Sequence, residues 1–204
     1  EGAENIGLLE SLGVLERLIP KFDQLKIIGP CKYHQEDVWT HSLFAVQQIE
    51  ELLKKDYWQD KVSQAKISLL KLAALFHDYG KLFTEEKIDG QIHFYGHHKV
   101  GAKKIYPILK ELSFSNRELD YITKLIRYHM RPLALYYAEN LTFKGKHRFF
   151  KAGGQFVEDI SLLAAADKMS TAKLNHREEE IAGSLDFLKE LIAEKERSTQ
   201  RTNK

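Results

Sequence analysis

The sequence has few of the residues that stabilise small secreted folds or break up regular structure. It contains one cysteine, Cys31, four prolines and twelve glycines among 204 residues. A single cysteine excludes an intramolecular disulfide and favours a reducing compartment, so we expect a cytoplasmic protein. With 31 basic and 29 acidic side chains, the net charge of +2 predicts neither nucleic-acid nor membrane affinity, although local patches remain possible.

Long apolar runs are also absent. No stretch approaches the roughly 20 residues of a membrane-spanning helix, and the charged start EGAEN does not resemble a signal peptide, so we expect no membrane association. The length suits one domain over residues 1–204, with a helical lead-in and a frayed C-terminal tail, RSTQRTNK. The sequence does not begin with Met, so both a free-standing protein and a piece of a longer one stay open, as does the oligomeric state.

Apolar residues recur every three or four positions through most of the chain, which predicts helices. Two signals refine this pattern: Asp37 is placed as an N-cap, and Ser115 with Glu118 forms a capping box. Asp89 and Gly90 separate two short alternating runs, which predicts a hairpin with a type I′ turn at about 86–94. We therefore predict an all-α helical bundle with one small β-hairpin. The helices are expected over residues 7–20, 37–55, 63–76, 98–112, 115–131, 157–173 and 184–196, with 133–154 left as a helix or loop excursion.

Several polar side chains occupy inward positions on the predicted helices. His41, His129 and Asp167 each fall on an apolar stripe of a different helix, and the apolar segment LAALFHDYGKL brings His77 and Asp78 to the core. Each of these alone is more often a hydrogen-bonded core residue than a ligand. A buried carboxylate costs several kcal/mol without a partner, whereas a divalent cation would satisfy the whole set at once. The pattern therefore favours a metal site.

The order His41, then His77 with Asp78, then Asp167 resembles the H…HD…D pattern of the HD superfamily of metal-dependent phosphohydrolases. More narrowly, six blocks are similar, in the same order, to the HD region of the bacterial tRNA nucleotidyltransferase and poly(A) polymerase family. These blocks are YHQEDVWTHSL, LFHDYGK, HFYGHHKVGA, LIRYHMRP, RFFKAGG and LLAAADK.

This resemblance implies a ligand set. One divalent ion would be held by His41, His77, Asp78 and Asp167. In some members a second ion shares the aspartate of the HD pair, and His97 and His129 stand where its further ligands would be. His98 occupies a position where the closer relatives usually have Glu, so either neighbouring histidine could turn inward; we predict that His97 does.

The chemistry of the site follows from these residues. A mixed imidazole and carboxylate set favours Mn, Fe, Co, Ni or Zn over Mg, in one or two copies. His77, Asp78 and Lys81 are the expected catalytic residues. Lys81 is a candidate for contacting a substrate phosphate, and its alternative is an ordinary solvated cation at a helix C-terminus. His34 is a candidate substrate contact, although exposed loop histidines are common.

Three hypotheses about function stay open. The first is a divalent-metal-dependent phosphohydrolase, a phosphodiesterase or phosphatase acting on nucleotides or RNA ends. The second is the C-terminal tRNA-binding region of a tRNA nucleotidyltransferase or poly(A) polymerase, without transferase activity because the sequence lacks a Gly-Ser motif with paired acids. There, a cluster interleaved with Phe149 and Phe150 could contact RNA; its basic residues are Lys144, Lys146, His147, Arg148 and Lys151. The third is a degenerate scaffold with a structural metal only.

Overall fold

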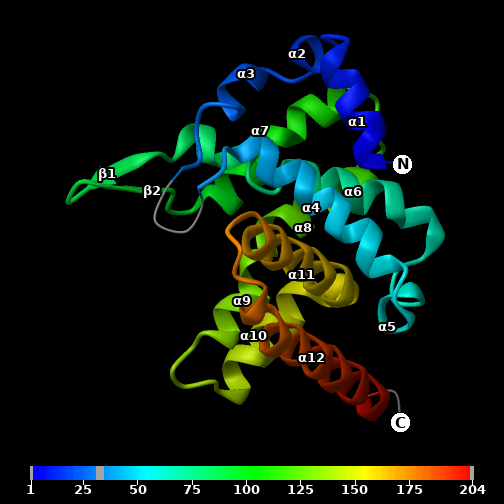
Figure 1. Ribbon diagram of the computed structural model, residues 1–204. Helices are drawn as coiled ribbons and strands as arrows, with labels where there is room; N and C mark the ends of the chain where they lie inside the picture. Colours follow the sequence, from blue (N-terminus) through cyan, green and yellow to red (C-terminus); the bar gives the residue numbers. More distant parts are fainter. Residues whose placement is uncertain (1, 31–34, 203–204) are drawn as a thin grey trace.

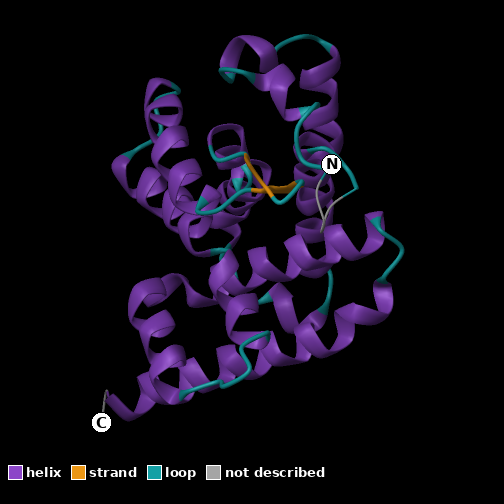
Figure 2. Ribbon diagram, turned by 90° about the vertical axis from the view of Figure 1, so that its left-hand side faces the viewer, coloured by secondary structure: helices purple, strands orange, loops and turns teal. Residues whose placement is uncertain are grey.

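The computed structural model describes residues 2–30 and 35–202. Within them the fold is all-α with one two-stranded antiparallel hairpin (Figures 1 and 2). His34, a predicted substrate contact, lies outside the described residues. Across the described part of the chain, no helix has both the length and the hydropathy that a membrane span requires.

The longer helices form the body of the molecule, and short helical turns connect them. The longer ones are α1 (Gly2–Ser11), α4 (Val38–Leu53), α6 (Ile67–Phe76), α7 (His97–Glu111), α8 (Asn116–Tyr128), α10 (Phe143–Gly153), α11 (Val157–Leu174) and α12 (Ile181–Thr202). The shorter elements are α2 (Leu15–Leu18), α3 (Phe22–Leu25), α5 (Asp56–Gln59), α9 (Met130–Tyr136), the 3₁₀ turns η1 (Gln64–Lys66), η2 (Tyr79–Phe83), η3 (Gly154–Phe156) and η4 (Glu178–Glu180), and the strands β1 (Glu86–Ile88) and β2 (Gln91–His93).

Helix α11 lies at the centre of the core. It packs along α4 and also contacts α6, α8 and α12 (Figure 1). Ala164, Ala165 and Ala166 are fully buried at the middle of the helix, and such small side chains allow neighbouring helices to approach closely. Because α11 is buried on most of its circumference, a polar residue on it needs partners from other helices.

The turn and cap predictions are confirmed. Asp37 accepts a hydrogen bond from the Thr40 amide at 2.8 Å, and Ser115 with Glu118 forms the reciprocal capping box. At the hairpin turn, Asp89 and Gly90 have φ of 50° and 81°, as a type I′ turn requires. The short-range chemistry of these residues was therefore sufficient to define local structure.

Two helix predictions are wrong. The helix predicted over residues 7–20 is interrupted: Gly13, with φ of 66°, separates α1 from α2, because a residue in the left-handed conformation ends a helix. Pro132 does not lie beyond a helix end but in the first turn of α9, where a missing amide costs no hydrogen bond. The excursion at 133–154 consists of the end of α9, a connection, and α10.

The predicted frayed tail is also helical. Helix α12 continues to Thr202, which includes most of RSTQRTNK. Its polar residues bond within the helix: Lys195 Nζ donates to Thr199 Oγ1 at 3.1 Å, and Ser198 Oγ donates to the Lys195 carbonyl at 2.7 Å. The position of this segment at the chain end had predicted fraying, whereas these contacts one turn apart support the helix.

Candidate metal centre

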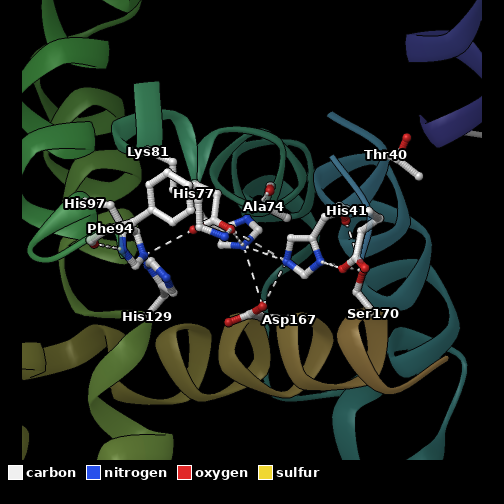
Figure 3. Close-up of polar contacts among 12 residues, drawn as sticks. Thr40, His41, Ala74, His77, Lys81, Phe94, His97, His129, Asp167 and Ser170 are labelled. Carbon is white, nitrogen blue, oxygen red and sulfur yellow. Dashed lines mark hydrogen bonds and ion pairs between the residues drawn. The ribbon is translucent and has the colours of Figure 1, made fainter. Parts of the chain in front are cut away.

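Histidines and aspartates from widely separated helical segments meet in the core (Figure 3). Each of these side chains comes from the end or the buried face of a helix. The apolar faces of the same helices pack around the polar groups. His41 lies in the first turn of α4, and Asp167 lies in the second half of α11. The others are His77 and Asp78 between α6 and η2, His97 at the start of α7, and His129 between α8 and α9.

Three of these side chains, His41, His77 and Asp167, surround one point, and Asp78 adjoins them. His41 Nε2 lies 3.2 Å from His77 Nε2 and 3.0 Å from Asp167 Oδ1. Asp78 Oδ2 is 3.5 Å from His77 Nε2 and 3.8 Å from His41 Nε2. Ligands held about 2.1 Å from one ion are separated by about 3.0 to 3.4 Å in tetrahedral or octahedral geometry. The spacings among His41, His77 and Asp167 are therefore close to those of a single metal shell, and Asp78 lies slightly farther out.

A second group of atoms adjoins the first. The other oxygen of Asp78, Oδ1, lies 3.1 Å from His97 Nε2. The His129 ring centroid lies 5.0 Å from that of His77 and 5.5 Å from that of His97. Asp78 therefore directs one oxygen to each group, as a bridging carboxylate would. The structure turns His97 to Asp78, and His98 stays half-buried beside it.

Main-chain hydrogen bonds orient three of the imidazoles. The Nδ1 atoms of His77, His97 and His129 lie 2.7, 2.8 and 2.7 Å from the carbonyl oxygen three residues earlier in each case. An Nδ1–H that donates to this carbonyl leaves Nε2 as the atom with a lone pair, and Nε2 is the atom that faces the cluster. Helix ends thus set both the direction and the tautomer of these rings.

His41 is oriented by side chains instead. Its Nδ1 lies 3.2 Å from Glu36 Oε1 and 3.3 Å from Ser170 Oγ. Burial lowers the pKa of His41, but hydrogen bonds with Asp167 and Glu36 outweigh burial and raise this pKa to about 9. Sequence analysis missed Glu36 and Ser170. Both flank ligand-bearing segments, but no local pattern in the sequence distinguishes them.

The residues fit a divalent ion on two observations. His129 Nε2 is buried and has no hydrogen-bond partner among the described residues, and burial together with nearby His77 lowers the His129 pKa to about 3. Burial raises the pKa of Asp78, yet the charges of Lys81 and His77 hold it well below its ordinary range. A neutral imidazole with an orphaned lone pair beside an ionised carboxylate is a donor set that a cation satisfies.

A cavity of about 350 Å³ opens onto the cluster. Asp78, His97 and Asp167 line it together with two lysines, Lys81 and Lys168. Lys81 is 4% exposed and its Nζ lies 2.7 Å from Asp78 Oδ2, so it is not the solvated cation of the alternative interpretation. The apolar part of the wall comes from the hairpin and α9 and consists of Ile92, Phe94, Tyr95, Met130 and Leu133.

A close contact between two backbones fixes the start of α7 against η2, the turn that follows His77 and Asp78. A Cβ at Gly80 would overlap the His97 carbonyl oxygen and lie 2.6 Å from the Gly101 nitrogen. Only glycine allows η2 and α7 to approach this closely. The crossing places His97 next to Asp78, although the two residues are far apart in the sequence.

Comparisons with known proteins agree with this architecture. The family model described as HD domain matches residues 38–172. The chain is 30% identical over 184 residues to a CC-adding tRNA nucleotidyltransferase of Thermus thermophilus, covering 89% of this chain and 38% of that protein. It is 27% identical over 170 residues to an A-adding tRNA nucleotidyltransferase of Deinococcus radiodurans, covering 82% and 36%. The chain thus spans little more than a third of the length of these curated relatives.

Proposed function

The chain belongs to the HD-domain family, and from that premise we propose that it is a divalent-metal-dependent phosphohydrolase acting on nucleotides or RNA ends. The observation that carries the proposal is the position of the His/Asp cluster at the floor of a cavity. A site that is open on one side leaves coordination positions for water and substrate, whereas a closed shell would serve structure only.

The proposed ligands form two sets. His41, His77, Asp78 and Asp167 would hold the first ion, and His97 and His129 would hold a second ion with Asp78 shared between the two sets. His77 also adjoins the second set, because His77, Asp78 and His129 place ligand atoms within 4.8 Å of one another. Bound divalent metal supplies Lewis-acid chemistry, acidifying water and polarising a phosphoryl oxygen. The mixed nitrogen and oxygen donors favour Mn, Fe, Co, Ni or Zn over Mg.

The other residues of the cavity have separate roles in the proposal. Lys81 keeps Asp78 ionised and presents a cation to a phosphate that enters the cavity. Asp78 then acts as a ligand and not as a general base, because an acid held well below its ordinary pKa accepts protons poorly. The apolar wall contributed by Phe94 and Met130 can accommodate a nucleoside, since flat bases pack on such surfaces.

The test combines metal analysis with turnover. Protein purified without chelator should contain divalent metal and, with added Mn, Co or Ni, should hydrolyse a generic phosphodiester and a panel of nucleotides. Chelator and Asp78→Asn should each abolish hydrolysis, while Asp186→Asn, the same change at an exposed position of α12, should keep full activity. Full turnover by folded Asp78→Asn protein would overturn the proposal.

A second candidate function is tRNA binding as part of a larger nucleotide-adding enzyme. The names of the two relatives and the partial coverage of their length favour it. The aromatic part of the predicted contact is wrong, because Phe149 and Phe150 are buried in the core. Lys146 is paired with Glu194 at 2.6 Å. The exposed basic side chains that remain on this surface are Lys144, His147, Arg148 and Lys151.

Three outcomes would separate the enzyme, the binding function and the degenerate scaffold. Folded, metal-loaded protein that hydrolyses nothing in the panel, yet binds tRNA with an affinity that falls steeply with salt, would favour the binding function. Hydrolysis that depends on Asp78 would favour the enzyme. A metal that is bound but inaccessible to small chelators would point to the degenerate scaffold.

A further inference from the structure

A second and larger cavity lies between α7 and α8. Its volume is about 860 Å³, and it takes its lining from the outer faces of these two helices. The lining includes a single carboxylate, Asp120, and an exposed aromatic ring, Tyr106. Five of its side chains are basic: Lys99, Lys103 and Lys104 on α7, and Lys124 and Arg127 on α8.

Much of this positive charge is not neutralised by the protein. Among the described residues, no ion pair involves Lys99, Lys103 or Arg127, and all three are exposed. Lys124 lies 4.0 Å from Asp120, at the limit of an ion pair. Since the whole chain carries a net charge of only +2, the cavity concentrates positive charge on one face.

We infer that this cavity between α7 and α8 binds the phosphate backbone of a single RNA strand. The choice of RNA over other polyanions rests on the proposed function, because the adjoining centre is proposed to act on nucleotides or RNA ends. A basic groove that also exposes an aromatic ring combines the two features by which proteins bind single strands: backbone attraction and base stacking.

The dimensions along α7 suit this ligand. Lys99 and Lys103 are one helical turn apart, and Tyr106 follows on the same helix. At 1.5 Å per residue, the segment from Lys99 to Tyr106 spans about 10 Å. A stacked strand advances about 3.4 Å per nucleotide, so the segment can follow about three nucleotides.

The cavity and the proposed metal centre use the same helical segments but different faces of them. Lys99 is two residues after His97, and Arg127 is two residues before His129. Residues two apart on a helix point to opposite sides, and among the described residues the cavity shares no lining residue with the cavity at the metal centre. A strand bound here would therefore run along the outer side of the segments that carry two proposed ligands.

The basic surface of α10 is less suited to an extended strand. It presents Lys144, Arg148 and Lys151 on one exposed helix face. The cavity next to it takes both Glu194 and Arg197 from α12, so its lining carries charges of both signs. Because α10 is also the RNA-binding surface of the second candidate function, a variant of this surface tests the rival site.

The test measures RNA affinity by fluorescence anisotropy with a labelled, generic single-stranded RNA of about 12 nucleotides. Binding is measured in chelator, so that turnover cannot consume the probe, between about 50 and about 200 mM salt. The groove variant is Lys99→Ala/Lys103→Ala/Arg127→Ala. The rival-surface variant is Lys144→Ala/Arg148→Ala/Lys151→Ala on α10. The control variant is Arg17→Ala/Lys55→Ala/Lys87→Ala, which removes the same charge from exposed positions outside both surfaces.

The groove variant should lose affinity on the order of 100-fold at about 0.1 M salt, and the slope of log affinity against log salt should fall by about 2. The control variant should bind like the wild type, and so should the charge-preserving Lys99→Arg/Lys103→Arg/Arg127→Lys. Circular dichroism and metal content show whether the variants fold. If the triple variant unfolds, Lys103→Ala alone should still weaken binding about 5-fold.

Three results would overturn the inference. These are an unchanged affinity in the groove variant, a loss in the α10 variant as large as in the groove variant, or competition by poly-glutamate as strong as that by unlabelled RNA. Because the assay needs no hydrolysis, a protein that binds RNA here but hydrolyses nothing would refute the proposed function and leave this inference intact.

Discussion

Helix α11 carries a buried carboxylate, Asp159, and a partly buried one, Asp167, whose side chain is 14% exposed, and their surroundings are opposite. Asp159, in its first turn, is 2% exposed and lies 3.4 Å from Lys66 Nζ. Burial dominates there, and it raises the pKa of Asp159 to about 6 although Lys66 opposes the shift. At Asp167, further along the helix, burial also raises the pKa, but hydrogen bonds with His41 and His77 hold it well below the ordinary range.

The comparison shows that burial alone does not identify a functional acid. One ammonium on a side chain that is 37% exposed is a weak partner, because water screens it. Two buried imidazoles are stronger partners, and Asp167 also borders a cavity that a ligand can enter. We therefore assign metal binding to the Asp167 end of α11 and a structural role to the Asp159 end.

The largest effect that separates the two ends is expected from Asp167→Asn. A neutral amide is a poorer ligand than a carboxylate, so bound metal should be lost. Loss of a residue that only supports a ligand can lower activity about 100-fold, so loss of the ligand itself should lower kcat/KM by at least that factor. Metal analysis and steady-state kinetics measure both. Asp159→Asn is the matched control and should keep metal and turnover; equal losses in the two variants would break the distinction.

The second effect concerns pH and stability at the Asp159 end. Because folding raises the pKa of Asp159 from 3.8 to about 6, the folded state holds this proton more tightly than the unfolded state. The contribution of Asp159 to the free energy of unfolding is therefore largest below about pH 4 and falls by about 3 kcal/mol as the pH rises through about 6 to about 7.

Asp159→Asn should remove that part of the pH dependence. Urea unfolding of the wild type and the variant between about pH 4 and pH 7 measures it as the difference between two curves, which cancels the contributions of other groups. Parallel curves for the two proteins would mean that Asp159 is ionised to the same extent in the folded and unfolded states.

The third effect, smaller than the first two, concerns how many metal ions bind at the Asp167 end of α11. His129→Asn removes the orphaned Nε2, so metal content should fall from about two ions per chain to about one, with activity reduced roughly 10- to 100-fold. His98→Asn, at the neighbouring half-buried ring, should keep both ions. Unchanged stoichiometry in His129→Asn would restrict the centre to the first ligand set.

The smallest effect is expected from Lys66→Met. The Lys66 ammonium lies over the rings of Tyr121 and Phe156 at 5.4 and 5.2 Å, and a methionine keeps the apolar contact with both. The free energy of unfolding near neutral pH should fall by about 1 kcal/mol or less. A loss several times larger in urea unfolding would show that Lys66 neutralises Asp159 more effectively than its exposure indicates.

Much of the architecture could be predicted because it depends on short-range chemistry. Helical periodicity, the Asp37 cap, the capping box and the Asp89–Gly90 turn each involve residues within a few positions of one another. The segment LAALFHDYGKL already shows that His77 and Asp78 enter the core. The family also follows from motif order, which is a property of the sequence alone.

Other features escaped prediction because they depend on contacts between distant segments. Lys81 has the sequence context of a solvated cation, but tertiary packing buries it against Asp78. Ser170 approaches His41 only because α4 and α11 pack side by side. Glu36, five residues before His41, reaches it at the start of α4. The basic cavity likewise exists only where α7 and α8 meet.

The two neighbouring histidines separate these contributions most clearly. The sequence by itself determined that an imidazole stands at the start of a helix near the HD pair, because either His97 or His98 would provide one. Only the tertiary structure decided which of the two faces Asp78. The backbone of η2 touches α7 at Gly80 and Gly101, and this contact fixes the rotation of α7, which directs His97 inward.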